Sequence, residues 1–443
     1  MSSVGISSEA LREMQNQCLR DAIVGCLFGS ALGDAIGLYT EFLSAEASKI
    51  AYPSRSFTLV PKSEATKLLS DPHRDPHVPG EWTDDTDHAL LILLSYLHKN
   101  GRDISPRDFA VRLDIWVRQG LRALDTLPMG LGQTVGSTVR SKTFLENPEE
   151  TALQRWKNSR YKAAANGSLM RTHPLGLMCL QKSLSETFQT AADFSVITHP
   201  DPRCIISCAI GTALVRGLIL REIRTEEDID MVIEKAISWF GLYREEQQKN
   251  AEREDEPDLD VEELQRHAKV KELTDLELDE PTKIGYVYKT FGAGIHLLRL
   301  SMRQTANLTA PLPSQTAIFE PLITDLIMLG GDADTNACFA GALVGAHLGF
   351  KALPPHWRDG LRYGEWLMAK AEGLCMTLNV VHGTYIGVQD RDTAPDGGRG
   401  LLTDAQMEDK VMRHMAGMMQ RLGAEGNKRK NSNWGWFSKK KMR

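Results

Sequence analysis

The sequence lacks the features of a membrane or secreted protein. No apolar run approaches the roughly 18 residues that a membrane-spanning helix needs, and residues 1–10 hold no basic region followed by an apolar one. At 443 residues and 42% hydrophobic content, the chain is still able to bury a large core. We therefore expect a soluble protein without a transmembrane segment, cytoplasmic or nuclear.

Cysteine-pair and phosphate-loop signatures are also missing. The seven cysteines are odd in number and form no C-x-x-C pair, which predicts free thiols in a reducing compartment. Cys204 and Cys208 have only His199 as a nearby companion, so a structural zinc site is not expected. No G-x-x-x-x-G-K-[ST] occurs, which excludes a P-loop nucleotide site.

Convincing period-two strands are absent, whereas helical periodicity dominates. Apolar residues recur at three- and four-residue spacing in these segments: 11–37, 87–97, 107–119, 185–197, 203–221, 228–242, 286–303, 319–329, 336–348 and 360–372. Small residues such as Gly25, Gly29, Gly341 and Gly345 let helices approach closely. The pattern predicts an all-α, single compact multi-helix domain.

We place this domain at residues 20–390. Residues 1–19 are predicted to be an N-terminal extension or the start of the first helix, and residues 391–443 a C-terminal extension. Within the domain, residues 244–282 carry fifteen Asp/Glu against six Lys/Arg and lack a sustained apolar period. They predict a solvated insertion between two helices, partly helical and partly disordered, away from any active site.

The C-terminal residues 428–443 are strongly basic. They carry seven Lys/Arg and no acid, with Trp434, Trp436 and Phe437 interleaved. Such a tail predicts weak contact with a polyanion such as nucleic acid or an anionic membrane. A disordered solubilising tail is the alternative.

The strongest chemical signal is a pair of carboxylate clusters. They are Thr83-Asp84-Asp85-Thr86-Asp87 and Gly331-Asp332-Ala333-Asp334-Thr335. Each opens an apolar helical segment. Neighbouring carboxylates repel one another, and a hard divalent cation with oxygen ligands removes that repulsion. The clusters predict a carboxylate-bridged metal site.

Helix capping is the structural alternative, because Asp and Thr favour helix N-termini through side-chain hydrogen bonds and the helix dipole. Two such clusters without a Lys or Arg between their acids favour the metal. The pair Asp332 and Asp334 also fits the D-x-D motif of haloacid-type phosphatases. The segment before it lacks strand alternation, which argues against that assignment.

Two glycine-containing turns are candidate contacts for phosphate groups. Asn166-Gly167-Ser168 follows three alanines and exposes backbone N–H groups, although N-G is first of all a turn former. Gly130 and Gly132 frame either a backbone-rich wall or a plain interhelical loop. His199 stands before Pro200 as a candidate contact to ribose or diphosphate, or as a capping residue.

Together these motifs resemble the ADP-ribosylglycohydrolase family. Four blocks match in the family's order: residues 25–37 running to Glu41-Phe42, Trp82-Thr83-Asp84-Asp85-Thr86, Asn166-Gly167-Ser168-Leu169-Met170-Arg171, and Gly330-Gly331-Asp332-Ala333-Asp334-Thr335-Asn336. Thr198-His199-Pro200 and Gly285-Tyr286-Val287 are weaker echoes. The resemblance covers about residues 20–375, outside the acidic segment, and implies an all-α fold with a central binuclear site.

The resemblance also assigns site residues. It implies two divalent cations, Mg²⁺ or Mn²⁺, with the following ligands: Thr83, Asp84, Asp85, Asp332, Asp334 and Thr335. Glu41 matches the catalytic acid, and Asp34 would instead be a buried residue that supports the site or caps a helix. Substrate contacts are implied for Asn166, Gly167, Ser168, His199, Gly130, Gly132 and Tyr286. Ala333 and Ala165 stand where the family often has Thr and Gly or Ser.

The implied activity is metal-dependent hydrolysis of the N- or O-glycosidic bond between ADP-ribose and an acceptor. The acceptor is an arginine or serine of a protein, a nucleic-acid end, or a small ADP-ribose derivative. The alternative is a catalytically inactive ADP-ribose-binding or structural protein on the same fold. A third possibility is an interaction protein that works through its acidic segment and basic tail. We expect a monomer.

Overall fold

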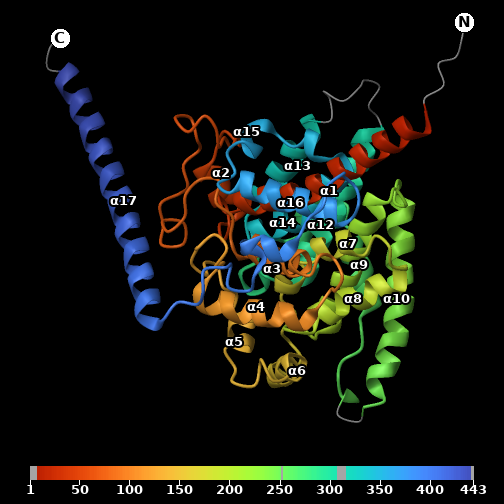
Figure 1. Ribbon diagram of the computed structural model, residues 1–443. Coiled ribbons are helices and arrows are strands. Elements are labelled where there is room, and N and C mark those ends of the chain that lie inside the picture. The colour runs from red at the N-terminus through yellow and green to blue at the C-terminus, as the bar shows by residue number, and fades with distance from the viewer. Residues whose placement is uncertain (1–6, 251–252, 307–315, 441–443) are drawn as a thin grey trace, which may run out of the picture.

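The computed structural model describes residues 7–250, 253–306 and 316–440, and within these ranges it contains helices and turns but no β-strand (Figure 1). The α-helices are α1 (Ser8–Gly37), α2 (Ala45–Ala51), α3 (Asp84–His98), α4 (Pro106–Gln119), α5 (Gln133–Val139), α6 (Pro148–Asn158), α7 (His173–Met178), α8 (Leu184–Ser195), α9 (Pro202–Ile219), α10 (Glu226–Gln248), α11 (Val261–Ala268), α12 (Val287–Ala306), α13 (Thr316–Ile327), α14 (Ala333–Leu348), α15 (Pro355–Arg358), α16 (Gly364–Thr377) and α17 (Asp404–Lys440).

The antiparallel pair α1 and α14 forms the centre of the fold. Glycines stand at every fourth position along the second half of α1, so one face of the helix has no side chains. A Cβ added at Gly29 would overlap the Gly341 carbonyl, and one added at Gly33 would overlap that of Ala337. The two backbones therefore touch. This contact continues to Gly37, which lies against Asp334, so the end of α1 is fixed beside the start of α14.

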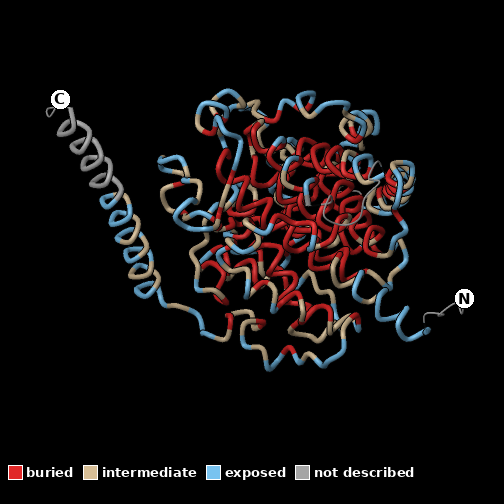
Figure 2. The backbone as a smooth tube through the Cα atoms, turned by 90° about the horizontal axis from the view of Figure 1, so that it is seen from above, coloured by how far each residue is buried: buried red, intermediate tan, exposed pale blue. Residues whose placement is uncertain are grey.

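The buried core surrounds this pair. Figure 2 shows buried backbone concentrated in the middle of the molecule, with exposed segments around it. Within the described residues, one helix, α9, is long and apolar enough to cross a membrane by length and composition alone. Its 18-residue window is 94% buried inside the protein, which is typical of a core helix.

The predicted fold class is confirmed. Each of the ten periodic segments overlaps one helix over most of its length, and the described residues form an all-α domain. Short helices such as α2 and α5, with seven residues each, did not stand out from the sequence because they span only about two turns. The predicted domain boundaries at residues 20 and 390 remain a prediction.

The acidic segment differs from the expected solvated insertion. In its described part, α10 continues to Gln248, α11 follows, and three leucines enter the core: Leu264, Leu276 and Leu278. Arg244 and Glu256 form an ion pair at 2.8 Å with both residues buried. Most of the acids in the described part are exposed, so the high charge did not reveal that the segment packs against the core.

The end of the acidic segment also supports the second carboxylate cluster. Asp279 accepts a hydrogen bond from the backbone N–H of Ala45 at 2.9 Å. The Leu278 carbonyl lies so close to Gly331 that a Cβ there would overlap it, and Gly331 has a positive φ of 72°. The segment therefore packs against the loop that precedes α14.

The C-terminal extension includes the long helix α17, which lies along one side of the molecule (Figure 1). Its first half contacts the body through Lys410 and Arg421, whose side chains donate to carbonyl oxygens of residues 75, 76, 119 and 126. The side chains of the predicted basic tail, residues 428–443, lie outside those that the structure describes.

Candidate metal centre

Three helix ends meet at the two carboxylate clusters. Asp34, in the last turn of α1, accepts hydrogen bonds from the backbone N–H of Thr83 at 2.9 Å and of Thr86 at 3.0 Å. It also accepts from their hydroxyl groups, at 2.9 and 2.6 Å. Asp34 therefore caps α3 and fixes the first cluster against α1, a positioning role. Burial raises its pKa to about 6, although these hydrogen bonds lower it.

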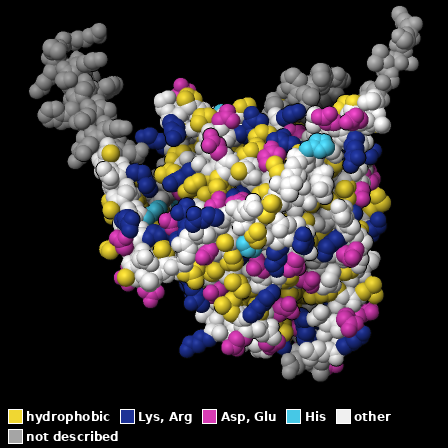
Figure 3. All heavy atoms as spheres, in the orientation of Figure 1, with side chains coloured by type: hydrophobic (Ala, Val, Ile, Leu, Met, Phe, Trp, Pro, Cys, Tyr) yellow, Lys and Arg dark blue, Asp and Glu magenta, His cyan; other side chains and the backbone are white. Residues whose placement is uncertain are grey.

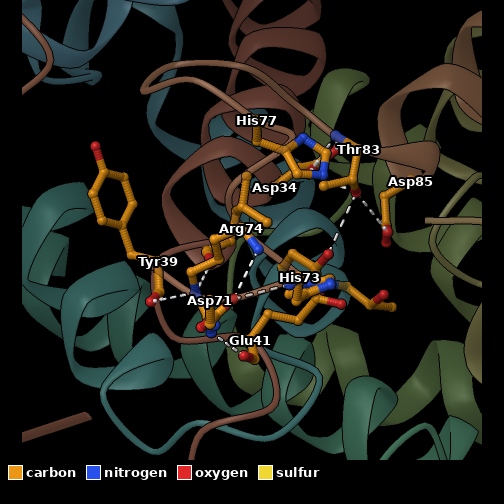
Figure 4. Close-up of polar contacts among 12 residues, drawn as sticks. Asp34, Tyr39, Glu41, Asp71, His73, Arg74, His77, Thr83 and Asp85 are labelled. Carbon is orange, nitrogen blue, oxygen red and sulfur yellow. Dashed lines mark hydrogen bonds and ion pairs between the residues drawn. The ribbon is translucent and has the colours of Figure 1, made fainter. Parts of the chain in front are cut away.

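The Thr83 hydroxyl lies among three carboxylates (Figure 4). Its oxygen is 2.9 Å from Asp34, 3.3 Å from Asp85 and 3.4 Å from Asp334. A hydroxyl has one proton, so it donates to only one of these oxygens at a time. The other carboxylate oxygens receive no proton from this hydroxyl. Such an arrangement of oxygen atoms fits a bound cation.

The carboxylates of the two clusters lie close to one another and repel one another when charged. Burial raises the pKa of Asp84 well above its usual range, and the charges of Asp85, Asp34, Glu41 and Asp332 raise it further. Burial and neighbouring carboxylates likewise raise the pKa of Asp85 and Asp334. One oxygen of Asp85, Oδ1, is buried without a hydrogen-bond partner. A divalent cation would satisfy this oxygen and neutralise the charge.

Glu41 lies in the turn after α1 and joins the second cluster. One carboxylate oxygen of Glu41, Asp332 and Asp334 each lie within 4.8 Å of one another. The Glu41 Oε2 is also 2.5 Å from Nε2 of His73, and the two side chains lie together in Figure 4. The Glu41 carbonyl accepts from Arg74, which fixes the backbone at this turn. Glu41 is thus held between the acid cluster and His73.

Asn166 reaches the same centre from the other side. It begins a short 3₁₀ turn, Asn166–Ser168, and its Nδ2 donates to Asp332 at 2.9 Å and to Thr290 at 2.9 Å. These bonds orient the Asp332 carboxylate. The Asp332 pKa is raised by burial to about 6, and the bond from Asn166 lowers it. Asn166 therefore contacts a predicted metal ligand directly.

The three glycines predicted to contact the substrate have different surroundings. Gly130, with φ 81°, lies against Asp84, where a Cβ would overlap the carboxylate. Gly167 lies against the imidazole of His199, with a built Cβ 3.2 Å from the ring. Gly132 caps α5 and has open space on its Cβ side. Gly130 and Gly167 thus allow close approach at the site, and Gly132 leaves room beside it.

His199 and Ser168 lie side by side behind the turn. Both are buried, and the Ser168 hydroxyl oxygen accepts hydrogen bonds from Ser195 at 3.1 Å and from the Cys208 thiol at 3.3 Å. His199 Nδ1 is 2.7 Å from the Thr198 hydroxyl, whereas Nε2 is buried without a partner. Burial lowers the His199 pKa well below its usual range. His199 also lines a cavity of about 260 Å³ that reaches Gln133 on α5. Nε2 of His199 is thus a buried nitrogen without a hydrogen-bond partner at the edge of this cavity.

The side chain of Tyr286 points to the acidic segment and not to the carboxylate clusters. Its phenol donates to Glu263 of α11 at 2.8 Å, and Arg203 lies over its ring at 5.6 Å. Its backbone pairs with Ala165 in an isolated bridge beside the site. The Tyr286 side chain is thus bound to the acidic segment, and the neighbouring Gly285 is the residue that lies against Asp332.

His73 and Arg74 were not identified from the sequence. They lie in a loop between α2 and α3 that has no periodicity, and 32 residues separate His73 from Glu41. The only available signal was composition, because Asp71, His73, Arg74 and His77 place four polar or charged residues in a short loop. Such a cluster is equally common on a solvated surface.

The donor set fits a hard divalent cation such as Mg²⁺ or Mn²⁺. Carboxylates and threonine hydroxyls from the starts of α3 and α14 supply only oxygen, and Glu41 adds a further carboxylate. The N-termini of both helices point at the centre, and their dipoles favour the negative charge gathered there. The predicted number of ions, two, remains a prediction.

Comparison with known proteins identifies the family of the chain. The chain matches the family model described as ADP-ribosylglycohydrolase over residues 15–383. It is 28% identical to "ADP-ribosylarginine hydrolase Tri1" of Serratia proteamaculans, over 80% of this chain and 79% of that protein. It is 23% identical to "ADP-ribosylhydrolase ARH3" of Bos taurus, over 76% of this chain and 87% of that protein.

A solved structure shares the fold. It is titled "ADP-ribosylglycohydrolase-related protein complex", with a TM-score of 0.50 and 22% sequence identity, and the match covers 81% of this chain and 98% of that one. The family model spans both carboxylate clusters, Glu41 and Asn166. The chain therefore belongs to the ADP-ribosylglycohydrolase family of hydrolases.

Proposed function

We propose that the protein hydrolyses the N- or O-glycosidic bond between ADP-ribose and an acceptor, in a reaction that depends on Mg²⁺ or Mn²⁺. The convergence of Glu41 with Asp332 and Asp334, within 4.8 Å, is the observation that carries this proposal. Glycoside hydrolysis needs a carboxyl group that exchanges a proton with the leaving atom or the attacking water. Glu41 has that chemistry beside a set of metal ligands.

The ligands for two ions are six oxygen donors: Thr83, Asp84, Asp85, Asp332, Asp334 and Thr335. When bound, the ions supply positive charge that orients the ribose hydroxyls and makes a nearby water more acidic. Asn166 holds Asp332 in place, and Asp34 holds the α3 cluster. Glu41 serves as general acid or base, and His73 orients its carboxylate.

Arginine is the acceptor that we would test first. Two relatives, from Serratia proteamaculans and Pseudomonas putida, are named ADP-ribosylarginine hydrolases, and the chain covers 79% and 78% of their lengths. The bovine relative is named an ADP-ribosylhydrolase without an acceptor, so serine belongs in the same comparison. The buried Nε2 of His199, which lacks a partner and lies beside Gly167, supports a role for His199 in contacting the ribose or diphosphate.

The test is release of free ADP-ribose from peptides modified on arginine or serine and from an ADP-ribosylated nucleic-acid end. Reactions are run with Mg²⁺, with Mn²⁺ and with a chelator, and the products are separated by chromatography. We expect metal-dependent release from at least one substrate. Binding of ADP-ribose without release from any of them would instead support the catalytically inactive alternative.

A further inference from the structure

A second polar cavity, of about 190 Å³, lies between the first half of α17 and the loops before α3 and α16. Three cationic side chains line it: Arg362 from the loop before α16, and Lys410 and Arg421 from α17. His77 and His414 complete this basic lining. The volume is far above the roughly 15 Å³ that one water requires. Figure 3 shows Lys and Arg side chains gathered where α17 meets the body of the molecule.

The acids in the wall already have partners. Glu81 accepts from Arg362 at 2.7 Å, and Asp125 accepts from Lys410 at 3.0 Å and from Arg122. Asp87 accepts from the indole N–H groups of Trp82 and Trp116, at 2.9 and 2.8 Å. Each acid thus has a cationic or an indole partner within the protein.

Arg421 is bound differently. Its guanidinium donates to the carbonyl oxygens of Asp75 and Pro76, at 3.3 and 3.2 Å, which carry no net charge. A guanidinium has five N–H donors, so groups remain for a ligand. Glu81, Asp87 and Asp125 stand against Arg362, Lys410 and Arg421, so the formal charges of the lining balance. Arg421 is the one of these three cations whose hydrogen bonds, among the described residues, go only to uncharged groups.

The two imidazoles of the lining are affected by burial and by the nearby arginines. Burial lowers the pKa of His77 to about 4, and repulsion from His73, His414, Arg362 and Arg421 adds to the effect. The pKa of His414 is lowered by burial and then by Arg421 and Arg362. Both rings are therefore neutral near pH 7 and can donate a hydrogen bond without adding charge.

We propose that this cavity binds an oxyanion of the phosphate type through the guanidinium groups of Arg421 and Arg362. Guanidinium groups that converge on one concave site recognise a multiply charged oxyanion through charge-assisted hydrogen bonds. Lys410 and Arg421 belong to α17, which lies beyond residue 383, where the family match ends. The site is thus a feature of this chain in addition to the family core.

The position of the cavity suggests how the anion is used. Thr83, a predicted metal ligand, lies in its wall, so the anion is held beside the metal loop. Arg362 and Tyr363 also line a larger hollow of about 700 Å³ that runs over the surface next to it. If an acceptor carried a phosphate near its modified residue, that phosphate would reach the proposed anion site through this hollow. A free phosphate would bind at the same site. A role of this anion site in substrate binding rests on the proposed function. Binding of the anion itself does not.

Binding is tested with inorganic phosphate as the probe, on the full chain kept metal-free with a chelator. Histidine-labelled protein is titrated while the His414 ring resonances are followed by NMR at several pH values. We expect a saturable shift and a higher His414 pKa in the presence of phosphate. Arg421→Gln should weaken the affinity at least about tenfold, because it removes a charged hydrogen-bond donor.

Arg413→Gln is the matched control. Arg413 lies on the same helix, is 77% exposed and pairs with Asp409, away from the cavity. Its replacement should leave the phosphate affinity unchanged. No saturable shift in the wild-type chain, or equal affinity in wild type and Arg421→Gln, would overturn the proposal.

Steady-state kinetics distinguish a phosphate carried by the acceptor from a free phosphate ion. Two ADP-ribosylated peptides are compared that differ only by a phosphoserine beside the modified residue. A lower KM for the phosphorylated peptide, lost in Arg421→Gln and kept in Arg413→Gln, assigns the site to a phosphate of the acceptor. A KM that responds instead to added inorganic phosphate assigns it to the free anion. Failure of hydrolysis in every sample would contradict the proposed function and leave the binding result standing.

Discussion

At the scale of single residues, the proposed chemistry rests on one carboxylate, that of Glu41. Glu41 is buried, lies with Asp332 and Asp334, and is held at 2.5 Å by His73. Its assignment as the acid came from the family resemblance, because a lone Glu after a helix is usually solvated. The structure supports the role with burial and with a partner that orients the carboxylate.

Glu41→Gln should therefore reduce turnover while ADP-ribose still binds. Glutamine keeps the shape but cannot exchange a proton, so we expect kcat to fall by about 10²–10⁴. The measurement combines steady-state release of ADP-ribose with calorimetric binding of ADP-ribose. Glu46→Gln on the exposed side of α2 is the control. Near-normal turnover in Glu41→Gln would assign the proton transfer to another group.

Asp332→Asn should weaken metal binding. The change removes a negative ligand and replaces one oxygen by an NH₂ group that cannot bind a cation, so we expect the affinity for Mn²⁺ to fall by at least about tenfold. Calorimetric titration of the purified protein measures this. Asp325→Asn on α13 is the control, since Asp325 is exposed and pairs with Arg55. Unchanged affinity in Asp332→Asn would refute its assignment as a ligand.

At the scale of elements, α1 and α14 position the site because their backbones touch. The glycines of α1 bring Asp34 and the turn with Glu41 to the start of α14, and Asp34 then holds α3. The small residues of both helices were visible in the sequence and predicted close approach. Their pairing with each other was not, because small residues specify a distance and not a partner.

Gly29→Ala tests this contact. The new methyl group would overlap the Gly341 carbonyl, so the backbones must separate, and we expect the free energy of unfolding to fall by about 3 kcal/mol. Chemical denaturation monitored by circular dichroism measures the change. Gly241→Ala in α10 has open space and should be neutral or stabilising by up to about 1 kcal/mol. Equal changes in the free energy of unfolding for the two substitutions would show that the α1–α14 contact can accommodate a methyl group.

Irregular elements explain most of what the sequence did not predict. The long helices follow the apolar period, whereas the His73 loop and the turn at Asn166 have none, and their contacts join distant residues. In the acidic segment, charge outweighed three buried leucines spread over fifteen residues, 264–278. A loop contact or a sparse core position leaves no periodic signal, so it appears only in three dimensions.

At the scale of the whole molecule, bound metal should contribute to stability in a pH-dependent way. Burial raises the pKa of Asp332 to about 6 and raises those of Asp84, Asp85 and Asp334 well above the usual range. The metal-free folded chain thus binds protons that the unfolded chain has lost above about pH 4. The contribution of these groups to stability falls as pH rises, and it is lost above their folded pKa values.

The gain in Tm on adding Mg²⁺ should accordingly be larger near pH 7.5 than near pH 5. Protons compete with the metal at the lower pH, whereas at the higher pH the metal relieves carboxylate repulsion. At about 100 times Kd we expect a gain of about 3 °C near pH 7.5. Scanning calorimetry with Mg²⁺ and with a chelator measures it. A gain that is equal or larger near pH 5 would contradict the raised pKa values.

The central claim is that the starts of α3 and α14, with Glu41 beside them, form one metal centre. Anomalous diffraction from crystals grown with Mn²⁺ tests this most directly, because it locates the ions without reference to activity. The account predicts two Mn²⁺ peaks among the oxygens of Thr83, Asp84 and Asp85 on one side and Asp332, Asp334 and Thr335 on the other. Mn²⁺ bound elsewhere in the chain, with no peak between these two clusters, would contradict it.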